Sequence, residues 1–182
     1  MNGRALRSAL ELGSAGLDFR DLPGADGSVY SLGSFDTSAA LVLVFVASGC
    51  PTVRYYGDRL AHLQRSRGAD GLQIVAVNAN SPHLSPLDDL GEMRRRFAES
   101  PWPFPYLKDP DGELARQCGA VCTPHAFVLD GERRLRYRGR IDDSRTGRRV
   151  SRHDLEAAVD DVLAGRPVDV AETDPFGCAI VW

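Results

Sequence analysis

The stretch Leu41-Val-Leu-Val-Phe-Val-Ala47, followed directly by Ser48-Gly-Cys-Pro51, decides the fold of this chain. Its first seven residues include no charged side chain, and apolar and polar residues do not alternate. This composition is typical of a strand that is buried on both faces, as in the middle of a parallel α/β sheet. We therefore place a central strand at Leu41–Ala47.

A helix follows this strand after the turn that contains Cys50. Gly49 interrupts the apolar run, and Pro51 suits the first position of a helix, where a missing N–H costs nothing. From Thr52 to about Arg67, apolar residues recur every three or four positions, which predicts an amphipathic helix. Cys50 would then lie at a helix N-terminus, where the helix dipole favours its thiolate. A reactive thiol is our interpretation, and a small buried core cysteine is the alternative.

Further strands and helices alternate along the rest of the chain. A polar loop at Asn78–Pro86 follows the second strand on the same side as Cys50, the side on which α/β sheets bind ligands. Three alternating prolines exclude a helix from Pro101–Leu107 and favour an extended segment at a sheet edge or over the surface. The other predicted elements are a hairpin within Leu17–Leu32, strands at Leu72–Val77, His125–Leu129 and Leu135–Arg138, and helices at Leu87–Phe97, Glu113–Cys118 and Asp154–Leu163.

Length and composition predict a soluble globular protein. The chain has 182 residues, of which 43% are hydrophobic and 26% charged. A net charge of −3 gives no reason to expect nucleic acid or an anionic membrane as partner. No apolar run reaches the roughly 20 residues of a membrane span, and we recognise no signal peptide near the N-terminus. We therefore expect a cytoplasmic protein.

The four cysteines are too few for a disulfide scaffold and lack the paired spacing of zinc ligands. In a reducing compartment, cysteines in such a pattern are more often redox-active or simply buried.

Several short motifs occur along the chain in a familiar order: Gly49-Cys-Pro-Thr-Val-Arg54, Val77-Asn-Ala-Asn80, Pro103-Phe-Pro-Tyr-Leu-Lys-Asp109, Gly119-Ala-Val-Cys-Thr-Pro124, Tyr137-Arg-Gly-Arg-Ile-Asp-Asp143 and Gly177-Cys-Ala-Ile-Val-Trp182. With them the chain resembles the peroxiredoxin-like branch of the thioredoxin superfamily, the redoxin or alkyl-hydroperoxide-reductase/thiol-specific-antioxidant type. The resemblance implies an α/β, thioredoxin-like fold, with a central mixed sheet flanked by helices, an N-terminal hairpin extension and a C-terminal tail. We accordingly divide the chain into a lead-in (1–16), a thioredoxin-like domain (17–168) and a tail (169–182).

The resemblance also implies a role for the turn at Thr123-Pro124. In the thioredoxin fold the corresponding proline is cis, and its turn packs beside the first active-site cysteine, here Cys50. Cys122 would then lie within a short movement of Cys50, and the two could close a disulfide. The alternative is that Cys122 merely packs under the turn.

Cys178, in the tail, is a second candidate for the thiol that resolves an intermediate on Cys50. The tail would have to dock for this role, and Ile180 and Trp182 are the apolar residues that could anchor it. Structural docking without catalysis is the alternative. We interpret Cys118 as a core residue.

Two departures from the resemblance bear on the reaction. No Cys-X-X-Cys motif is present, because Val53 stands three residues after Cys50, so any resolving thiol must come from elsewhere. Typical peroxiredoxins carry a Thr three residues before the reactive Cys and a Pro seven before it, where this chain has Ala47 and Leu43. These departures weaken the peroxidase interpretation. The residues expected to shape the site are Pro51, Thr52, Arg54, Thr123 and Pro124, with Ser48 also nearby.

The sequence therefore predicts a thiol-dependent oxidoreductase in which Cys50 attacks a peroxide or a disulfide. Cys122 or Cys178 would resolve the intermediate, an external thiol (thioredoxin or a small thiol) would reduce the enzyme, and we expect no cofactor or metal. One alternative is a protein-disulfide reductase without peroxidase activity. Another is a non-catalytic binding module that uses the Asn78–Pro86 loop and the Pro101–Pro105 segment. A soft-metal site built from Cys118, Cys122 and His125 is the least favoured alternative.

Overall fold

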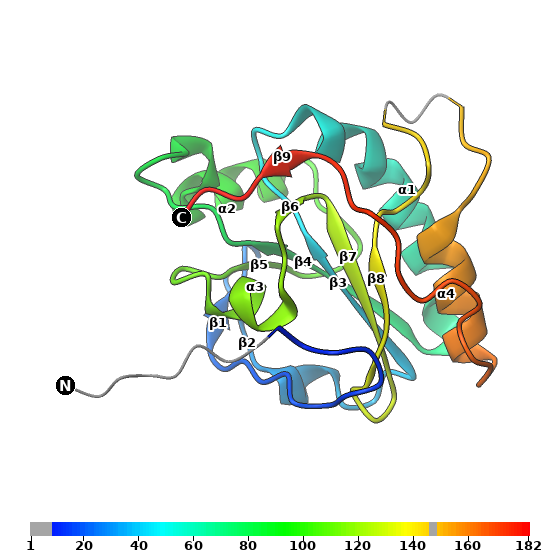
Figure 1. The fold of residues 1–182 in the computed structure, drawn as a ribbon. Helices are drawn as coiled ribbons and strands as arrows, with labels where there is room; N and C mark the ends of the chain where they lie inside the picture. The colour runs from blue at the N-terminus through cyan, green and yellow to red at the C-terminus, as the bar shows by residue number, and fades with distance from the viewer. Residues whose placement is uncertain (1–8, 146–148) are drawn as a thin grey trace.

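A five-stranded mixed sheet forms the centre of the computed structural model, which describes residues 9–145 and 149–182 (Figure 1). Strands β3, β4 and β5 run parallel, and β7 and β8 continue the sheet antiparallel. The expected α/β class with a central mixed sheet flanked by helices is confirmed. The strand order is β5 (Tyr106–Lys108), β4 (Leu72–Asn78), β3 (Ala40–Phe45), β7 (His125–Asp130) and β8 (Leu135–Gly139).

Strand β3 lies in the middle of the sheet and is buried along its whole length. Val42 and Val44 enter the core on one face, whereas Leu41 and Leu43 enter the core on the other. Side chains of this kind each contribute about 1.5–3 kcal/mol when they are fully buried. Burial on both faces explains why this strand shows no alternation of apolar and polar residues.

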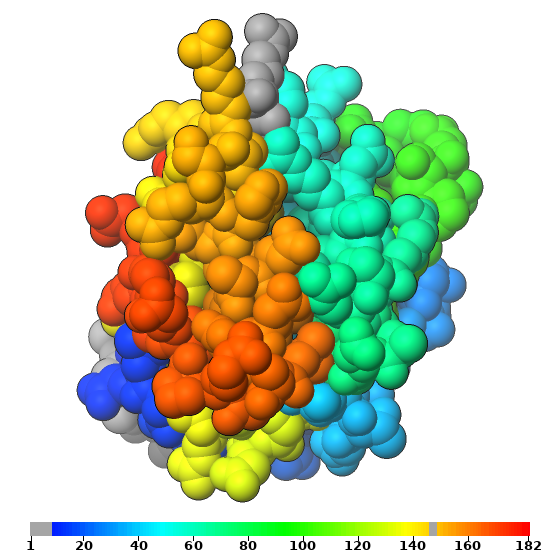
Figure 2. All heavy atoms as spheres, turned by 90° about the vertical axis from the view of Figure 1, so that its right-hand side faces the viewer, coloured from blue at the N-terminus to red at the C-terminus, as the bar shows by residue number. Residues whose placement is uncertain are grey.

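Helices α1 (Pro51–Arg67), α2 (Leu90–Glu99) and α4 (Asp154–Leu163) cover one face of the sheet. Figure 2 shows α4, in orange, beside α1, in turquoise. Arg67 of α1 and Asp160 of α4 form an ion pair of 2.7 Å between these two helices. The short helix α3 (Glu113–Cys118) and the segment that contains Leu17 and Phe19 cover the opposite face.

Most predicted elements are present with shifts of a few residues at their ends. The predicted helix at 87–97 is a 3-10 turn, η3 (Pro86–Asp88), followed by α2, because the Asp89 side chain accepts the Gly91 N–H and starts a new helix there. The proline-rich segment leads into the edge strand β5, as expected. The N-terminal hairpin is also present, with two residues in each strand, β1 (Leu22–Pro23) and β2 (Val29–Tyr30). Two further 3-10 turns are η1 (Leu32–Phe35) and η2 (Gly68–Asp70).

The C-terminal tail ends in a strand that we did not predict. Strand β9 (Cys178–Ala179) pairs antiparallel with β6 (Cys122–Thr123) in a separate two-stranded sheet. In Figure 1 the tail, in red, passes over the end of the molecule where β6 lies. The Thr123–Pro124 peptide bond is cis, which confirms the expectation for this turn.

The division into lead-in (1–16), domain (17–168) and tail (169–182) stays a prediction, and residues 1–8 of the lead-in lie outside the described residues. Within 9–145 and 149–182, no helix combines the length and the apolar character that crossing a membrane requires.

Candidate active site

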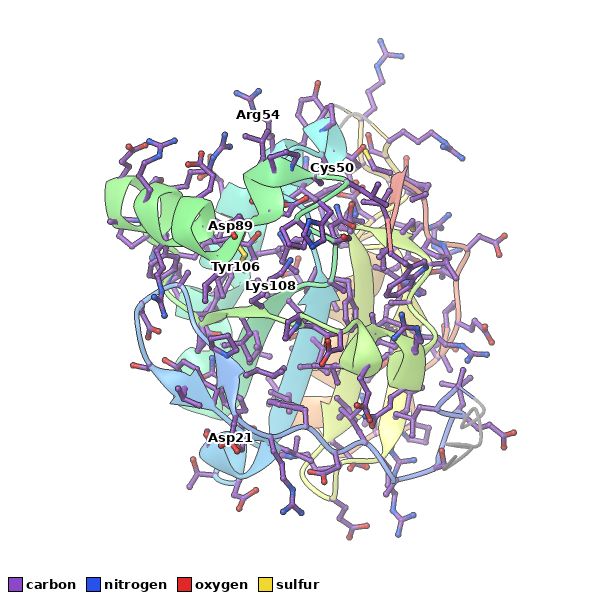
Figure 3. All side chains as sticks on the ribbon, turned by 90° about the vertical axis from the view of Figure 1, so that its left-hand side faces the viewer. Asp21, Cys50, Arg54, Asp89, Tyr106 and Lys108 are labelled. Carbon is purple, nitrogen blue, oxygen red and sulfur yellow. The ribbon has the colours of Figure 1, made fainter. Side chains whose placement is uncertain are left out.

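Cys50 lies between the end of β3 and the start of α1, as the sequence predicts. It is the N-cap residue of α1, Pro51 occupies the first turn, and the Cys50 N–H donates to Ala47 O at 3.2 Å. Only 2% of Cys50 is exposed. In Figure 3, Arg54 points away from the body of the molecule above Cys50, whereas Tyr106 and Lys108 lie among the strands below. Cys50 is therefore a buried thiol at the end of the sheet.

The Cys178 thiol lies against Cys50. The two sulfur atoms are 2.8 Å apart, and both residues are free thiols. A disulfide bond measures about 2.05 Å, so a small movement would close one. The pairing of β9 with β6 places Cys178 opposite Thr123, and the Thr123 carbonyl oxygen accepts from the Cys50 thiol at 3.1 Å. Backbone pairing of the tail thus brings the second sulfur to the first.

Gly177 explains how the tail approaches so closely. Its φ angle is +155°, and a Cβ at this position would lie 1.9 Å from the Thr123 carbonyl oxygen. No other residue fits here without displacing one of the two strands. The Gly-Cys sequence of the tail therefore supplies both the close approach and the sulfur.

The pKa of Cys50 is below its ordinary value. Burial acts to raise this pKa, but hydrogen bonds from the side chains of Cys178 and Thr123 and from backbone N–H groups outweigh burial. The backbone donors are Val53, in the first turn of α1, and Cys178. The charged form of Cys50 is thus stabilised by the tail as well as by the helix N-terminus that we predicted.

The other three thiols are held in their neutral form. Burial, the hydrogen bond to Cys50 and the Cys50 charge raise the pKa of Cys178 to about 11. Burial and the Cys50 charge raise the pKa of Cys122 to about 11. Cys118 lies in the core, as expected, and burial raises its pKa well above the ordinary range. Among the four cysteines Cys50 alone has a pKa below its ordinary value, and Cys178 lies beside it with a raised pKa.

The predicted site residues fall into two groups. Cys50, Cys178 and the turn at Thr123-Pro124 are in contact with one another. The Cys122 thiol instead lies under the turn: the residue is 8% exposed, and its sulfur lies 3.8 Å from the Pro124 carbonyl oxygen. Contact with Cys50 therefore favours Cys178 over Cys122 as resolving thiol, and both roles stay predictions. Thr52 and Arg54 lie on the first turn of α1, with Arg54 exposed.

A groove of about 450 Å³ lies beside this turn. Arg54 lines it together with Ala47 and Ser48 of the Cys50 loop, Phe97 of α2 and Trp102.

Sequence reasoning missed a buried polar cluster beneath the Cys50 turn. Asp88 is fully buried and accepts four hydrogen bonds, including one from the Ser48 N–H. The signal was available in part, because the buried strands β4 and β5 each end in a polar residue, Asn78 and Lys108. The cluster comprises Ser48, Asn78, Asn80, Ser85, Asp88, Tyr106 and Lys108.

The metal-site alternative gains no support here. Among the described residues, no group of three or more His, Cys, Asp or Glu side chains could hold a metal ion. His125 is 5% exposed, and burial lowers its pKa to about 4. Its Nδ1 accepts the Val121 N–H at 3.4 Å, so His125 is a neutral residue at the start of β7.

Comparison with known proteins decides the family. A model of the Redoxin family matches residues 11–159. The chain belongs to the Redoxin family. A similar structure is that of a hypothetical protein from Sinorhizobium meliloti 1021, which is 37% identical, with a TM-score of 0.87 and 96% of each chain covered. An uncharacterized conserved protein from Geobacillus kaustophilus is 34% identical, with a TM-score of 0.88, and the match covers 95% of this Redoxin chain and 93% of the other.

A curated relative of this Redoxin-family chain carries a functional name. "Thiol:disulfide interchange protein DsbE" of Tatumella citrea is 28% identical over 112 residues, which is 62% of this chain and 55% of the relative. The chain thus matches about half the length of that protein.

Proposed function

We propose that this Redoxin-family protein is a thiol–disulfide oxidoreductase in which Cys50 and Cys178 alternate between a dithiol and a disulfide. The observation that carries the proposal is the 2.8 Å approach of the two sulfur atoms, held by the β6–β9 pairing. Family membership and the name of the curated relative support the same class of chemistry.

The reaction begins with the thiolate of Cys50. It attacks one sulfur of a substrate disulfide, forms a mixed disulfide and expels the other sulfur as a thiolate. Cys178 then loses its proton and attacks the Cys50 sulfur, which releases the second substrate thiolate and leaves a Cys50–Cys178 disulfide. The substrate gains two electrons from the protein. An external thiol reductant (thioredoxin or a small thiol) then supplies two electrons to the Cys50–Cys178 disulfide, restores the dithiol and is itself oxidised to a disulfide.

We favour a disulfide over a peroxide as substrate. A peroxide would oxidise the Cys50 thiolate to a sulfenic acid, and the rest of the peroxide would leave as an alcohol or water. Attack of Cys178 on the sulfenic acid would then form the disulfide and release water. Ala47 stands where peroxiredoxins use a Thr hydroxyl to hold the peroxide. The polar groups at the Cys50 sulfur include the carbonyl oxygen and side chain of Thr123, the Cys178 thiol, and the backbone N–H groups of Val53 and Cys178.

Insulin reduction and peroxide consumption, measured side by side on one preparation, test the proposal. We expect the wild-type protein to reduce insulin disulfides much faster than it consumes peroxide, and Cys50→Ser to do neither. After one equivalent of disulfide oxidant, mass spectrometry of non-reduced peptides should show a Cys50–Cys178 link. The link should persist in Cys122→Ser, the matched control, and be lost in Cys178→Ser.

Each adverse result points to a different alternative. A Cys50–Cys122 link would change the resolving residue. Faster turnover of peroxide would restore the peroxidase interpretation. If Cys50 forms no internal disulfide and the protein turns over neither insulin nor peroxide, the non-catalytic binding module becomes the better interpretation.

A further inference from the structure

The carboxylate of Asp88 anchors the Cys50 turn. Asp88 is fully buried, and its Oδ1 accepts the Ser48 N–H at 2.7 Å and the Asn78 amide at 2.6 Å. Its Oδ2 accepts from the Ser85 hydroxyl at 2.6 Å and from the Asn80 amide at 2.9 Å. Four donors thus converge on two oxygen atoms. These hydrogen bonds outweigh burial and keep the pKa of Asp88 below its ordinary value.

The same carboxylate is connected to the tail through Asn80. The Asn80 Nδ2 donates to Asp88, so its Oδ1 faces the other way and accepts the Val181 N–H at 3.0 Å. The Ser81 N–H donates to the Val181 carbonyl at 2.7 Å, which ties the tail to this loop a second time. Val181 lies three residues after Cys178, so these bonds fix the tail just beyond the sulfur.

The orientation of the Asn80 amide depends on Asp88 being a carboxylate. An ionised carboxylate only accepts hydrogen bonds, so the amide must present its NH₂ to Asp88 and its oxygen to the tail. Buried Lys108 holds neighbouring groups in place, because its Nζ donates to the Asn80 backbone carbonyl oxygen and, at 3.4 Å, to Asn78 Oδ1, so that the Asn78 amide presents its NH₂ to Asp88. An amide at position 88 would turn one acceptor into a donor, and at least one of the converging N–H or O–H groups would lose its partner.

We propose that Asp88 is a positioning residue that holds the Cys50 turn and the C-terminal tail in register, so that the Cys178 sulfur stays at the Cys50 sulfur. The proposal rests on the proposed function for its redox consequence and on the hydrogen bonds for its structural one. Asp88 touches neither sulfur and acts through Ser48 on one side and Asn80 on the other.

Asp88→Asn tests the proposal, with Asp109→Asn as the matched control. Asp109 is also a buried carboxylate near Lys108, but it accepts the Ala115 N–H in the first turn of α3. In Asp88→Asn we expect the amides of Ser48 and Val181 to exchange hydrogen at least about tenfold faster. The equilibrium constant for the Cys50–Cys178 disulfide in a glutathione buffer should fall by at least about tenfold, because the two thiols lose effective concentration. Asp109→Asn should change neither quantity. If both variants behave alike, Asp88 has no positioning role.

Asn80→Ala decides the matter if Asp88→Asn does not fold. It removes the connection to the tail and leaves the Ser48 bond to Asp88. We expect faster exchange at Val181 only, together with a weaker disulfide; unchanged Val181 exchange would overturn the proposal. If the wild-type protein forms no Cys50–Cys178 disulfide, the proposed function fails, and the exchange pattern of the three variants still decides the role of Asp88.

Discussion

The reactivity of Cys50 depends on the thiol beside it. Burial of Cys50 acts to raise its pKa, and the hydrogen bond from Cys178 is the largest of the contributions that lower it. We predict that Cys178→Ala raises the pKa of Cys50. Cys178→Ser also removes the Cys178 sulfur but keeps a hydroxyl that can donate to Cys50, so it should raise this pKa less. The thiolate fraction falls as pH drops through the pKa, so the rate of alkylation follows that midpoint. Alkylation of Cys50 measured against pH should therefore show a higher midpoint in Cys178→Ala. A midpoint in Cys178→Ala equal to that of the wild type would assign the lowered pKa to the backbone donors instead.

Single residues also show how far sequence reasoning reaches. Cys50 could be identified because Gly49, Pro51 and the adjoining strand and helix are its neighbours in the sequence. Asp88 could not, because its four partners come from the Cys50 turn, from the last residue of β4 and from the loop after β4. From the sequence, Asp88 is predicted to lie in the first turn of a charged helix. Its burial depends on tertiary contacts that no local pattern encodes.

At the level of elements, periodicity predicted the long helices and the core strands, because each repeats its pattern over several turns or residue pairs. The pair β6–β9 contains two residues in each strand. Such short strands carry no periodicity, so only the resemblance pointed to the tail as part of the site. The tail strand also covers the edge of β6, whose backbone groups would otherwise lack partners.

Gly177 is the residue on which this strand pairing depends. We predict that Gly177→Ala forces β9 away from Thr123, lowers the yield of the Cys50–Cys178 disulfide and destabilises the fold. The matched control is Gly165→Ala, where φ is +67° and no atom lies within 4 Å of the added Cβ. Backbone strain alone costs about 1–2 kcal/mol at such a position. Thermal unfolding and non-reducing mass spectrometry separate the two effects, since both variants should melt earlier but only Gly177→Ala should lose the link. Full disulfide yield in Gly177→Ala would show that the tail tolerates a wider approach.

On the scale of the whole molecule, the site is assembled from three segments far apart in the chain, which contain Cys50, Thr123 and Cys178. Cys50 follows the central strand β3. The tail first pairs with β8 through a β-bridge between Glu172 and Arg138, and its strand β9 then pairs with β6. The tail also contributes to the core, because Ile180 is 7% exposed and packs with the residues of the α3 face. The redox site and the C-terminal packing are therefore one arrangement, and stability and disulfide formation should change together.

Truncation after Phe176 tests this coupling. The deletion removes β9, Ile180 and Trp182 but keeps Thr173, whose hydroxyl lies 2.7 Å from the Tyr137 hydroxyl and accepts the Arg140 N–H at 3.1 Å. Burial of a side chain such as Ile180 contributes about 1.5–3 kcal/mol, so the melting temperature should fall by roughly 5 °C. Trp182 is 49% exposed and stacks on Arg116 at 4.6 Å, a contact that contributes about 0.5–1 kcal/mol. Trp182→Ala is thus the control with the smaller loss. An unchanged melting temperature in the truncated protein would mean that the tail does not dock in solution, and Cys178 would then reach Cys50 only by chance encounter.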